Sequence, residues 1–165
     1  YLLPENQLDR FLLRIHLGYP ERSREKEILH QQPGRFKLDH LEPVLSTDDV
    51  QALQGQATQV KIDPALVDYL MDIVEATRGH EQLHTGISPR GSLALLKLSR
   101  CRAALDGRDY VTPDDVKSVA VPALAHRLTL RPELWVQRVS AEDVVQERLD
   151  TVPTPVAEDL GAPSA

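Results

Sequence analysis

The sequence predicts a mainly α-helical protein, and three features indicate this class. Only 4% of the 165 residues are aromatic, whereas Leu, Ala, Val, Asp, Glu and Arg are plentiful. This composition favours helices with aliphatic cores over a β-sandwich or a barrel. Capping residues mark several helix starts, and apolar residues recur at helical spacing behind them. The length fits one ordinary globular domain, or one domain with a fragment of another.

Helix starts are easy to locate in this sequence. Asp63, Ser88 and Thr112 are N-capping residues, and each precedes a proline, which is favourable at the first helical position. Capping boxes with an aspartate in the fourth place begin at Ser46 and Ser140. The apolar residues behind these starts repeat as they do on a core-facing helix surface. The sequence therefore predicts helices over 20–32, 47–58, 64–78, 89–106, 113–127 and 141–149.

The first twenty residues follow a different pattern. A helical turn is expected around 4–10, and apolar and polar residues then alternate over 11–17, which is typical of a strand. A strand needs a partner for its backbone groups, so we expect this one to belong to a sheet formed mostly outside this chain. Shorter extended pieces at 60–62 and 128–130 could pair with each other as a small ladder.

Charge and cysteine content disfavour several classes of protein. The chain has 19 Lys and Arg against 25 Asp and Glu, a net charge of -6, which argues against general binding of nucleic acid. No apolar run is long enough to cross a bilayer, and the single cysteine, Cys101, cannot form an internal disulfide. A cytoplasmic location is therefore expected. The proline-rich, small and polar residues of 151–165 predict a flexible tail.

One string has the spacing of a zinc site. His80-Glu81-Gln82-Leu83-His84 matches H-E-x-x-H, with which a helix binds zinc while the glutamate activates water. The string lies between Gly79 and Gly86, where a helix ends or a loop runs, and no further His or Glu follows for about forty residues. We therefore predict a solvated loop without a metal there, with a zinc peptidase as the minor alternative.

Two arginines are stronger candidates for a binding site. Arg90 lies in the first turn of a predicted helix, where unpaired amides and the helix dipole favour an anion such as phosphate. Arg10 lies between the helical turn and the strand, next to Asp9. For each arginine the alternative is a structural salt bridge with a nearby carboxylate. The sequence has no G-x-x-x-x-G-K-[ST] loop and no strand ending in adjacent acidic residues, so it holds no complete nucleotide site.

Three strings, taken together, resemble one protein family. They are LPENQLDRF at 3–11, GISPRGSLALL at 86–96 and GRDYVTPDDV at 107–116. In this order they resemble the C-terminal part of MoxR-family AAA+ ATPases, and the resemblance spans residues 1 to about 155. The sequence departs from the common family form at Asn6, where Ala is usual, and at Gly91, where Ala often follows the arginine. In a first helical turn, Gly91 should lower the stability of the helix by ~1 kcal/mol relative to Ala.

The resemblance implies a role for each arginine. Residues 1–19 would be the last helix and strand of the α/β nucleotide-binding core, 20–150 the helical lid and 151–165 the tail. Arg10 would be the arginine finger, which reaches the γ-phosphate of ATP held by a neighbouring subunit. Arg90 would be the sensor-2 arginine, which contacts the phosphates in its own subunit. Both roles fit the charge that spreads over a transferring phosphoryl group.

The resemblance also implies a function for the whole protein. We expect a ring-forming, Mg-dependent ATPase with a chaperone-like role in protein or metal-cofactor maturation, assembled through a core outside this chain. A von Willebrand-type metal-binding protein is a possible partner, whereas nucleic acid is not expected. This chain alone should bind no ATP or Mg and should hydrolyse no ATP. The competing hypothesis is a non-enzymatic helical interaction module in which both arginines form salt bridges.

Overall fold

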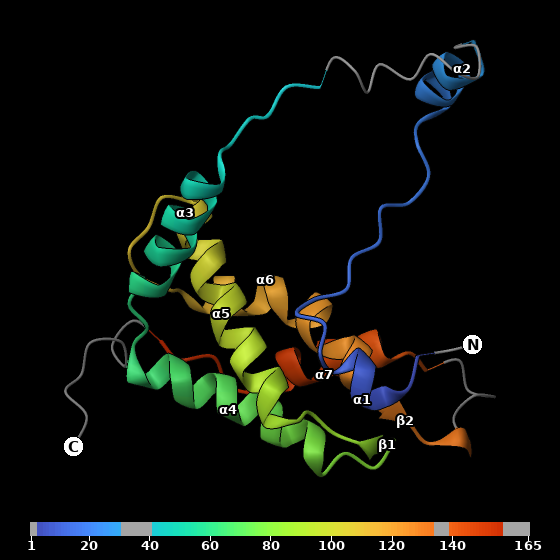
Figure 1. The fold of residues 1–165 in the computed structure, drawn as a ribbon. Coiled ribbons are helices and arrows are strands. Elements are labelled where there is room, and N and C mark those ends of the chain that lie inside the picture. Colours follow the sequence, from blue (N-terminus) through green and yellow to red (C-terminus); the bar gives the residue numbers. More distant parts are fainter. Residues whose placement is uncertain (1–2, 31–40, 134–138, 157–165) are drawn as a thin grey trace.

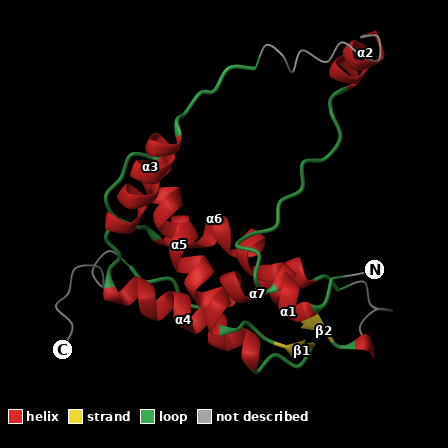
Figure 2. Cartoon of the chain, in the orientation of Figure 1, coloured by secondary structure: helices red, strands yellow, loops and turns green. Residues whose placement is uncertain are grey.

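The computed structural model describes residues 3–30, 41–133 and 139–156 (Figure 1). Over these residues it has seven α-helices and one sheet of two short strands (Figure 2), which confirms the mainly helical prediction. Residues 31 and 32 of the predicted helix 20–32, and residues 157–165 of the predicted tail, lie outside the described residues. The elements in chain order are α1 (Glu5–Leu8), α2 (Arg22–His30), α3 (Thr47–Gln59), α4 (Pro64–Arg78), β1 (Leu83–Thr85), α5 (Pro89–Leu105), α6 (Pro113–Leu124), the 3-10 helix η2 (Ala125–Arg127), β2 (Thr129–Leu130) and α7 (Ala141–Thr151).

Capping hydrogen bonds explain why the helices begin where the sequence places them. The Asp63 carboxylate accepts from the Ala65 N–H at 2.9 Å, and a proline follows at the first position of α4. Ser46, Thr112 and Ser140 form complete capping boxes at the starts of α3, α6 and α7. In each box the cap side chain accepts from the N–H of the aspartate three residues later, and that aspartate accepts from the cap residue's own N–H. Two backbone N–H groups at the helix start therefore gain hydrogen bonds.

The core lies between α4, α5, α6 and α7. Helix α5 is central, because it contacts α3, α4 and α6 (Figure 1). Its buried side consists largely of small residues, whereas α4 and α6 supply larger apolar side chains such as Leu66, Ile73 and Val116. Helix α2 buries no residue and lies away from this bundle (Figure 1). None of the helices in the described part of the chain is long and apolar enough to span a membrane.

The predicted strand at 11–17 is not formed in this structure. The segment is extended and exposed, and it joins no ladder among the described residues. It is tied to the bundle by a hydrogen bond from the Arg14 N–H to the Pro122 carbonyl oxygen at 2.9 Å and by bonds that His126 and Arg127 donate to its first carbonyl oxygens. Alternation alone makes no strand, because the ladder hydrogen bonds need a partner strand. Ile15 and Leu17 are accordingly 65% and 92% exposed.

The small sheet also differs from the prediction in its partners. Strand β2, within the predicted extended piece 128–130, pairs antiparallel with β1 and not with 60–62. In the predicted piece 60–62, Lys61 instead forms an isolated parallel bridge with Tyr110. The turn after α4 brings β1 beside β2, and an added hydrogen bond from the Arg131 N–H to the Gln82 carbonyl oxygen extends the contact. Local alternation marks extended segments, but their partners depend on how the helices pack.

Candidate functional site

The end of α6 holds a histidine and an arginine that both contact the N-terminal segment. Pro122 lies inside α6, and the chain then tightens into η2 over Ala125–Arg127. Proline has no N–H to donate to the preceding turn, so regular helical bonding is interrupted near this end. His126 and Arg127 are buried, and the Arg127 side chain is only 1% exposed. A buried guanidinium requires partners for its charge and its donors.

Arg127 has an acceptor for each of its five N–H donors. Its Nε donates to the carbonyl oxygen of Ala123 at 2.8 Å. Its Nη1 donates to the backbone carbonyl of Asp9 and, at 2.7 Å, to the Asp9 carboxylate. Its Nη2 donates to the carbonyl oxygens of Phe11 at 2.5 Å and Leu12 at 3.4 Å. This set of acceptors suits the planar fork of arginine, and a lysine could not satisfy it.

The Asp9 carboxylate joins this arginine to the start of α5. The Ser88 hydroxyl donates to both Asp9 oxygens, at 2.9 and 3.0 Å. The same Ser88 oxygen accepts from the Gly91 N–H at 3.4 Å as the N-cap of α5. Ser88 therefore caps its helix and holds the end of the N-terminal helical turn. A small hollow of about 200 Å³ beside this contact is lined by Asp9, Ser88 and Arg127, among others.

Gly91 has a packing role that the sequence did not reveal. A Cβ atom at this position would lie 2.5 Å from Ile87 Cγ2 and 3.2 Å from Arg127 Cδ. The first distance is too short for two carbon atoms, and Gly91 is buried. The predicted disadvantage of glycine in this helical turn is therefore offset, because its missing side chain leaves room for Ile87 and Arg127.

The two predicted site arginines lie on either side of the contact between Asp9 and Ser88. Arg10 directly follows Asp9, and Arg90 lies two residues after Ser88 in the first turn of α5. Both are exposed, and neither side chain has an ion pair or hydrogen bond among the described residues. The carboxylate nearest to Arg10 in the sequence is already used by Arg127 and Ser88. The structure thus brings the two predicted segments together and leaves both arginine heads available.

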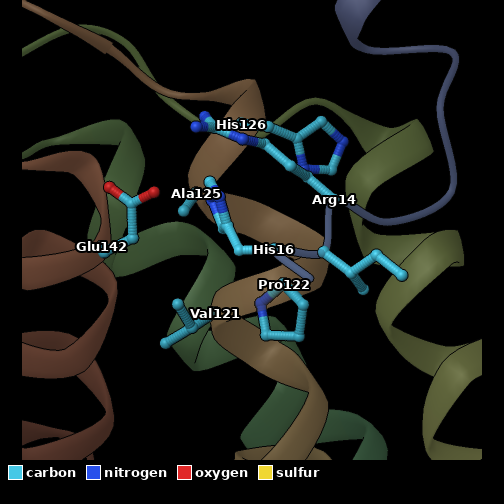
Figure 3. A pocket seen from close by; sticks show the side chains of 8 residues that line it. Arg14, His16, Val121, Pro122, Ala125, His126 and Glu142 are labelled. Carbon is cyan, nitrogen blue, oxygen red and sulfur yellow. The ribbon is translucent and has the colours of Figure 1, made fainter. Parts of the chain in front are cut away.

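A cavity of about 340 Å³ lies beside the contact of Arg127, Asp9 and Ser88, between residues 14–16, α6 and the start of α7 (Figure 3). Its lining includes Arg14, His16, His126 and Glu142. The His126 Nε2 lies 3.1 Å from the Phe11 carbonyl oxygen, which can only accept, so Nε2 carries the proton. Burial lowers the pKa of His126, and the nearby Arg127 and Arg14 add to this effect despite the hydrogen bond with Phe11. Neither Arg10 nor Arg90 lines the cavity.

The H-E-x-x-H string does not have the geometry of a zinc helix. His80 lies in a turn, whereas His84 is exposed on β1, so the two imidazoles do not share a helix face. The prediction of a solvated loop is wrong for His80, whose side chain is 9% exposed. Its Nδ1 accepts from the Gln82 N–H at 3.2 Å, and its Nε2 lies 3.6 Å from Glu147. The described residues contain no cluster of three or more potential metal ligands.

Comparison with known proteins identifies the family. The model of the AAA lid domain matches residues 75–148. The chaperone MoxR1 of Mycobacterium tuberculosis is 40% identical over 167 residues, which cover 94% of this chain and 43% of that protein. The chain belongs to the MoxR family of AAA+ ATPases, in its C-terminal lid region.

Two further relatives also match nearly all of this MoxR-family chain. The protein YeaC of Bacillus subtilis is 40% identical over 156 residues, which are 94% of this chain and 49% of YeaC. The crystal structure of a predicted ATPase from Cytophaga hutchinsonii aligns with a TM-score of 0.84 at 30% identity, over 94% of this chain and 50% of that one. The chain thus spans about half the length of the relatives it matches.

The MoxR lid uses residues for this junction that sequence reasoning missed. Arg127 is the last residue of the predicted helix 113–127, where a basic residue needs no special explanation because it suits the helix dipole. Asp9 was noted only as the neighbour of Arg10, and Ser88 only as a helix cap. Their contacts link residues that are 79 and 118 positions apart. No local pattern in the sequence signals such a link.

Proposed function

We propose that this chain contains the lid and the arginine finger of an ATP-hydrolysing ring ATPase of the MoxR type. Arg10 would complete the ATP site of a neighbouring subunit, and Arg90 would contact the phosphates bound by its own subunit. One observation carries this proposal. Arg10 and Arg90 are exposed and unpaired among the described residues, while Asp9, the carboxylate best placed to neutralise Arg10, is held by Arg127 and Ser88.

The chemistry of the two positions suits a triphosphate. Pro89 has no N–H, and the Gly91 and Ser92 N–H groups donate to Ser88, so the Arg90 N–H is the free amide of the first turn of α5 among the described residues. The 17-residue helix also has the positive end of its dipole at this turn. Acidic residues are found in the first turns of α3, α6 and α7 but not in those of α4 and α5, and of these two only α5 has an arginine there. A guanidinium at such an end attracts an anion, and phosphate is bound in this way at many helix starts.

Arg10 and Arg90 would act on charge that develops during phosphoryl transfer. An arginine that contacts the transferring group stabilises its equatorial oxygens, and bound Mg supplies further neutralisation in ATPases of this kind. The loop and carboxylates that hold ATP and Mg would belong to the core of the intact protein, so this chain alone would be inactive.

The work of the intact protein follows from its relatives as a proposal. MoxR1 is described as a chaperone, and we extend to the intact protein a chaperone-like role in protein or metal-cofactor maturation. The ring would form by self-association through that core, with a von Willebrand-type metal-binding protein as a partner and a cytoplasmic location.

The test is ATP turnover by the full-length ATPase with single substitutions. Arg10→Ala should lower kcat about 10³-fold or more, as the loss of an arginine finger does elsewhere. Arg90→Ala should also lower turnover severely. Arg22→Ala is a matched control, because Arg22 is an exposed arginine of α2 with no part in the junction. Wild-type turnover in either site variant would remove the phosphate role from that arginine and favour a helical interaction module.

A further inference from the structure

Arg127 connects three parts of the chain that lie far apart in the sequence. Its donors reach Ala123 in the last turn of α6, Asp9 after α1, and the carbonyl oxygens of the following segment. Asp9 then extends the connection to Ser88 at the start of α5. Arg127, Asp9 and Ser88 are called the junction below.

The junction is built as a rigid connection. The Arg127 side chain is 1% exposed, and hydrogen bonds between charged groups are strong where water is excluded. Arg127 has all five donors engaged, so it cannot rotate without losing several hydrogen bonds together. Ile87 and the absent side chain of Gly91 fix the space beside its aliphatic part. A shift of the start of α5 should therefore move Asp9, and with it Arg10.

We propose that the junction couples neighbouring ATP sites, with Arg127, Asp9 and Ser88 as positioning residues that link Arg90 to Arg10. This rests on the proposed function, in which Arg90 contacts ATP in its own subunit and Arg10 reaches ATP in the next. When bound ATP moves the start of α5 toward its phosphates, Ser88 moves with the helix. Asp9 is hydrogen-bonded to Ser88, so it shifts as well and moves Arg10. Each subunit's arginine finger then depends on whether its own site is occupied, which is a coupling between two distinct sites.

The experiment is steady-state ATP hydrolysis by the full-length ATPase as a function of ATP concentration. The wild-type protein should show positive cooperativity, with a Hill coefficient above one. Ser88→Ala removes the link between α5 and Asp9, and Arg127→Lys removes the fork that holds Asp9. Both variants should lower the Hill coefficient toward one and lower kcat about tenfold, a small part of the 10³-fold or greater contribution of an arginine finger, because Arg10 is present but poorly positioned.

Two matched controls separate coupling from stability. Ser140→Ala removes a serine cap from α7, and Arg108→Met breaks another arginine–aspartate pair of the lid. Both should leave the Hill coefficient unchanged. Urea unfolding of each variant should show that Ser88→Ala destabilises the chain somewhat more than Ser140→Ala, because each loses a helix cap and Ser88 also loses its hydrogen bonds to Asp9. Both variants should nevertheless remain folded at the temperature of the assay.

The outcomes distinguish this inference from the proposed function. If Arg10→Ala keeps full turnover, the proposed function fails and the coupling fails with it. If Arg10→Ala loses turnover but Ser88→Ala and Arg127→Lys match the wild type, only the coupling is overturned. A wild-type Hill coefficient of one, or an equal loss of cooperativity in Ser140→Ala, would also overturn it. In the Arg10→Ala background, Ser88→Ala should have no further effect on kcat, because the finger is already gone.

Discussion

Two arginine–aspartate pairs of this chain have similar chemistry but join residues at very different distances along the sequence. Arg108 donates to both oxygens of Asp115 at 2.6 Å, and these residues are only seven positions apart. Asp115 also completes the capping box of α6 through Thr112. Arg127 and Asp9 are 118 positions apart, and Arg127 donates to four backbone carbonyls in addition to the carboxylate. The first pair organises one helix start, whereas the second joins separate parts of the fold.

The electrostatics of the local pair support this distinction. Burial would raise the pKa of Asp115, but hydrogen bonds from Arg108 and Thr112 outweigh it and hold that pKa below its usual value of 3.8. The same pair raises the pKa of Arg108 above its ordinary value. Arg108 also contacts Asp106 at 3.1 Å, so it serves a local network around the start of α6. Such a network stabilises the lid without touching the segments that carry Arg10 and Arg90.

The largest expected effect comes from breaking the long-range pair. Arg127→Met keeps a side chain of similar length but leaves the Asp9 carboxylate and several carbonyls without donors. Loss of one partner of a buried ion pair typically costs about 3 kcal/mol. We expect a decrease of this size in the free energy of unfolding, measured by urea denaturation of the 165-residue chain.

Arg108→Met is the comparison variant for that measurement. Arg108 is more exposed than Arg127, at 25% against 1%, and Asp115 keeps its hydrogen bonds with Thr112. Loss of the Arg108 side chain should therefore lower the urea midpoint less than loss of the Arg127 side chain. Equal or greater destabilisation by Arg108→Met would show that the Arg127–Asp9 pair contributes no more to the free energy of unfolding than the Arg108–Asp115 pair.

An intermediate effect is expected from filling the space beside Arg127. Gly91→Ala would place a Cβ 2.5 Å from Ile87 Cγ2, and such overpacking typically costs about 1–3 kcal/mol. Gly55→Ala is the matched control, because it lies within α3 with open space around it and should stabilise the chain by up to about 1 kcal/mol. Thermal unfolding should shift in opposite directions for the two variants. A stabilising Gly91→Ala would contradict the close packing at the junction.

The smallest effect concerns the histidine beside the junction. Burial lowers the pKa of His126 from its ordinary value of 6.5, so the unfolded chain takes up this proton more readily than the folded chain. The stability contributed by neutral His126 is present above pH 6.5 and is lost as the pH falls toward the folded-state pKa. His126→Gln keeps an N–H donor for Phe11 without titrating. It should therefore flatten the pH dependence of the urea midpoint between pH 7 and 5, whereas an unchanged slope would contradict this origin.

Helices were predictable here because their signals are local. The caps at Asp63, Ser88 and Thr112 act within three residues of themselves, so the starts of α4, α5 and α6 follow from short strings. The strand at 11–17 and the partner of 128–130 depend on segments distant in sequence. The first was expected to pair outside this chain and stays a prediction, whereas the predicted pairing of 128–130 with 60–62 was wrong. The phosphate-binding roles of Arg10 and Arg90 stay predictions. The contacts of Arg127 depend on Asp9 and on space at Gly91, which no local pattern reveals.

The central claim, that Arg10 and Arg90 serve different ATP sites, is tested most directly by mixing subunits of the full-length ATPase. Arg10→Ala and Arg90→Ala proteins should each be nearly inactive alone. In a mixed ring, an Arg10→Ala subunit retains Arg90 and can receive an intact finger from an Arg90→Ala neighbour. Random mixing should complete roughly a quarter of the sites and raise turnover above the sum of the two variants, even if the finger from an Arg90→Ala subunit works about tenfold more slowly because its own site is impaired. Turnover that never exceeds that sum would contradict the claim, because both arginines would then act within one subunit.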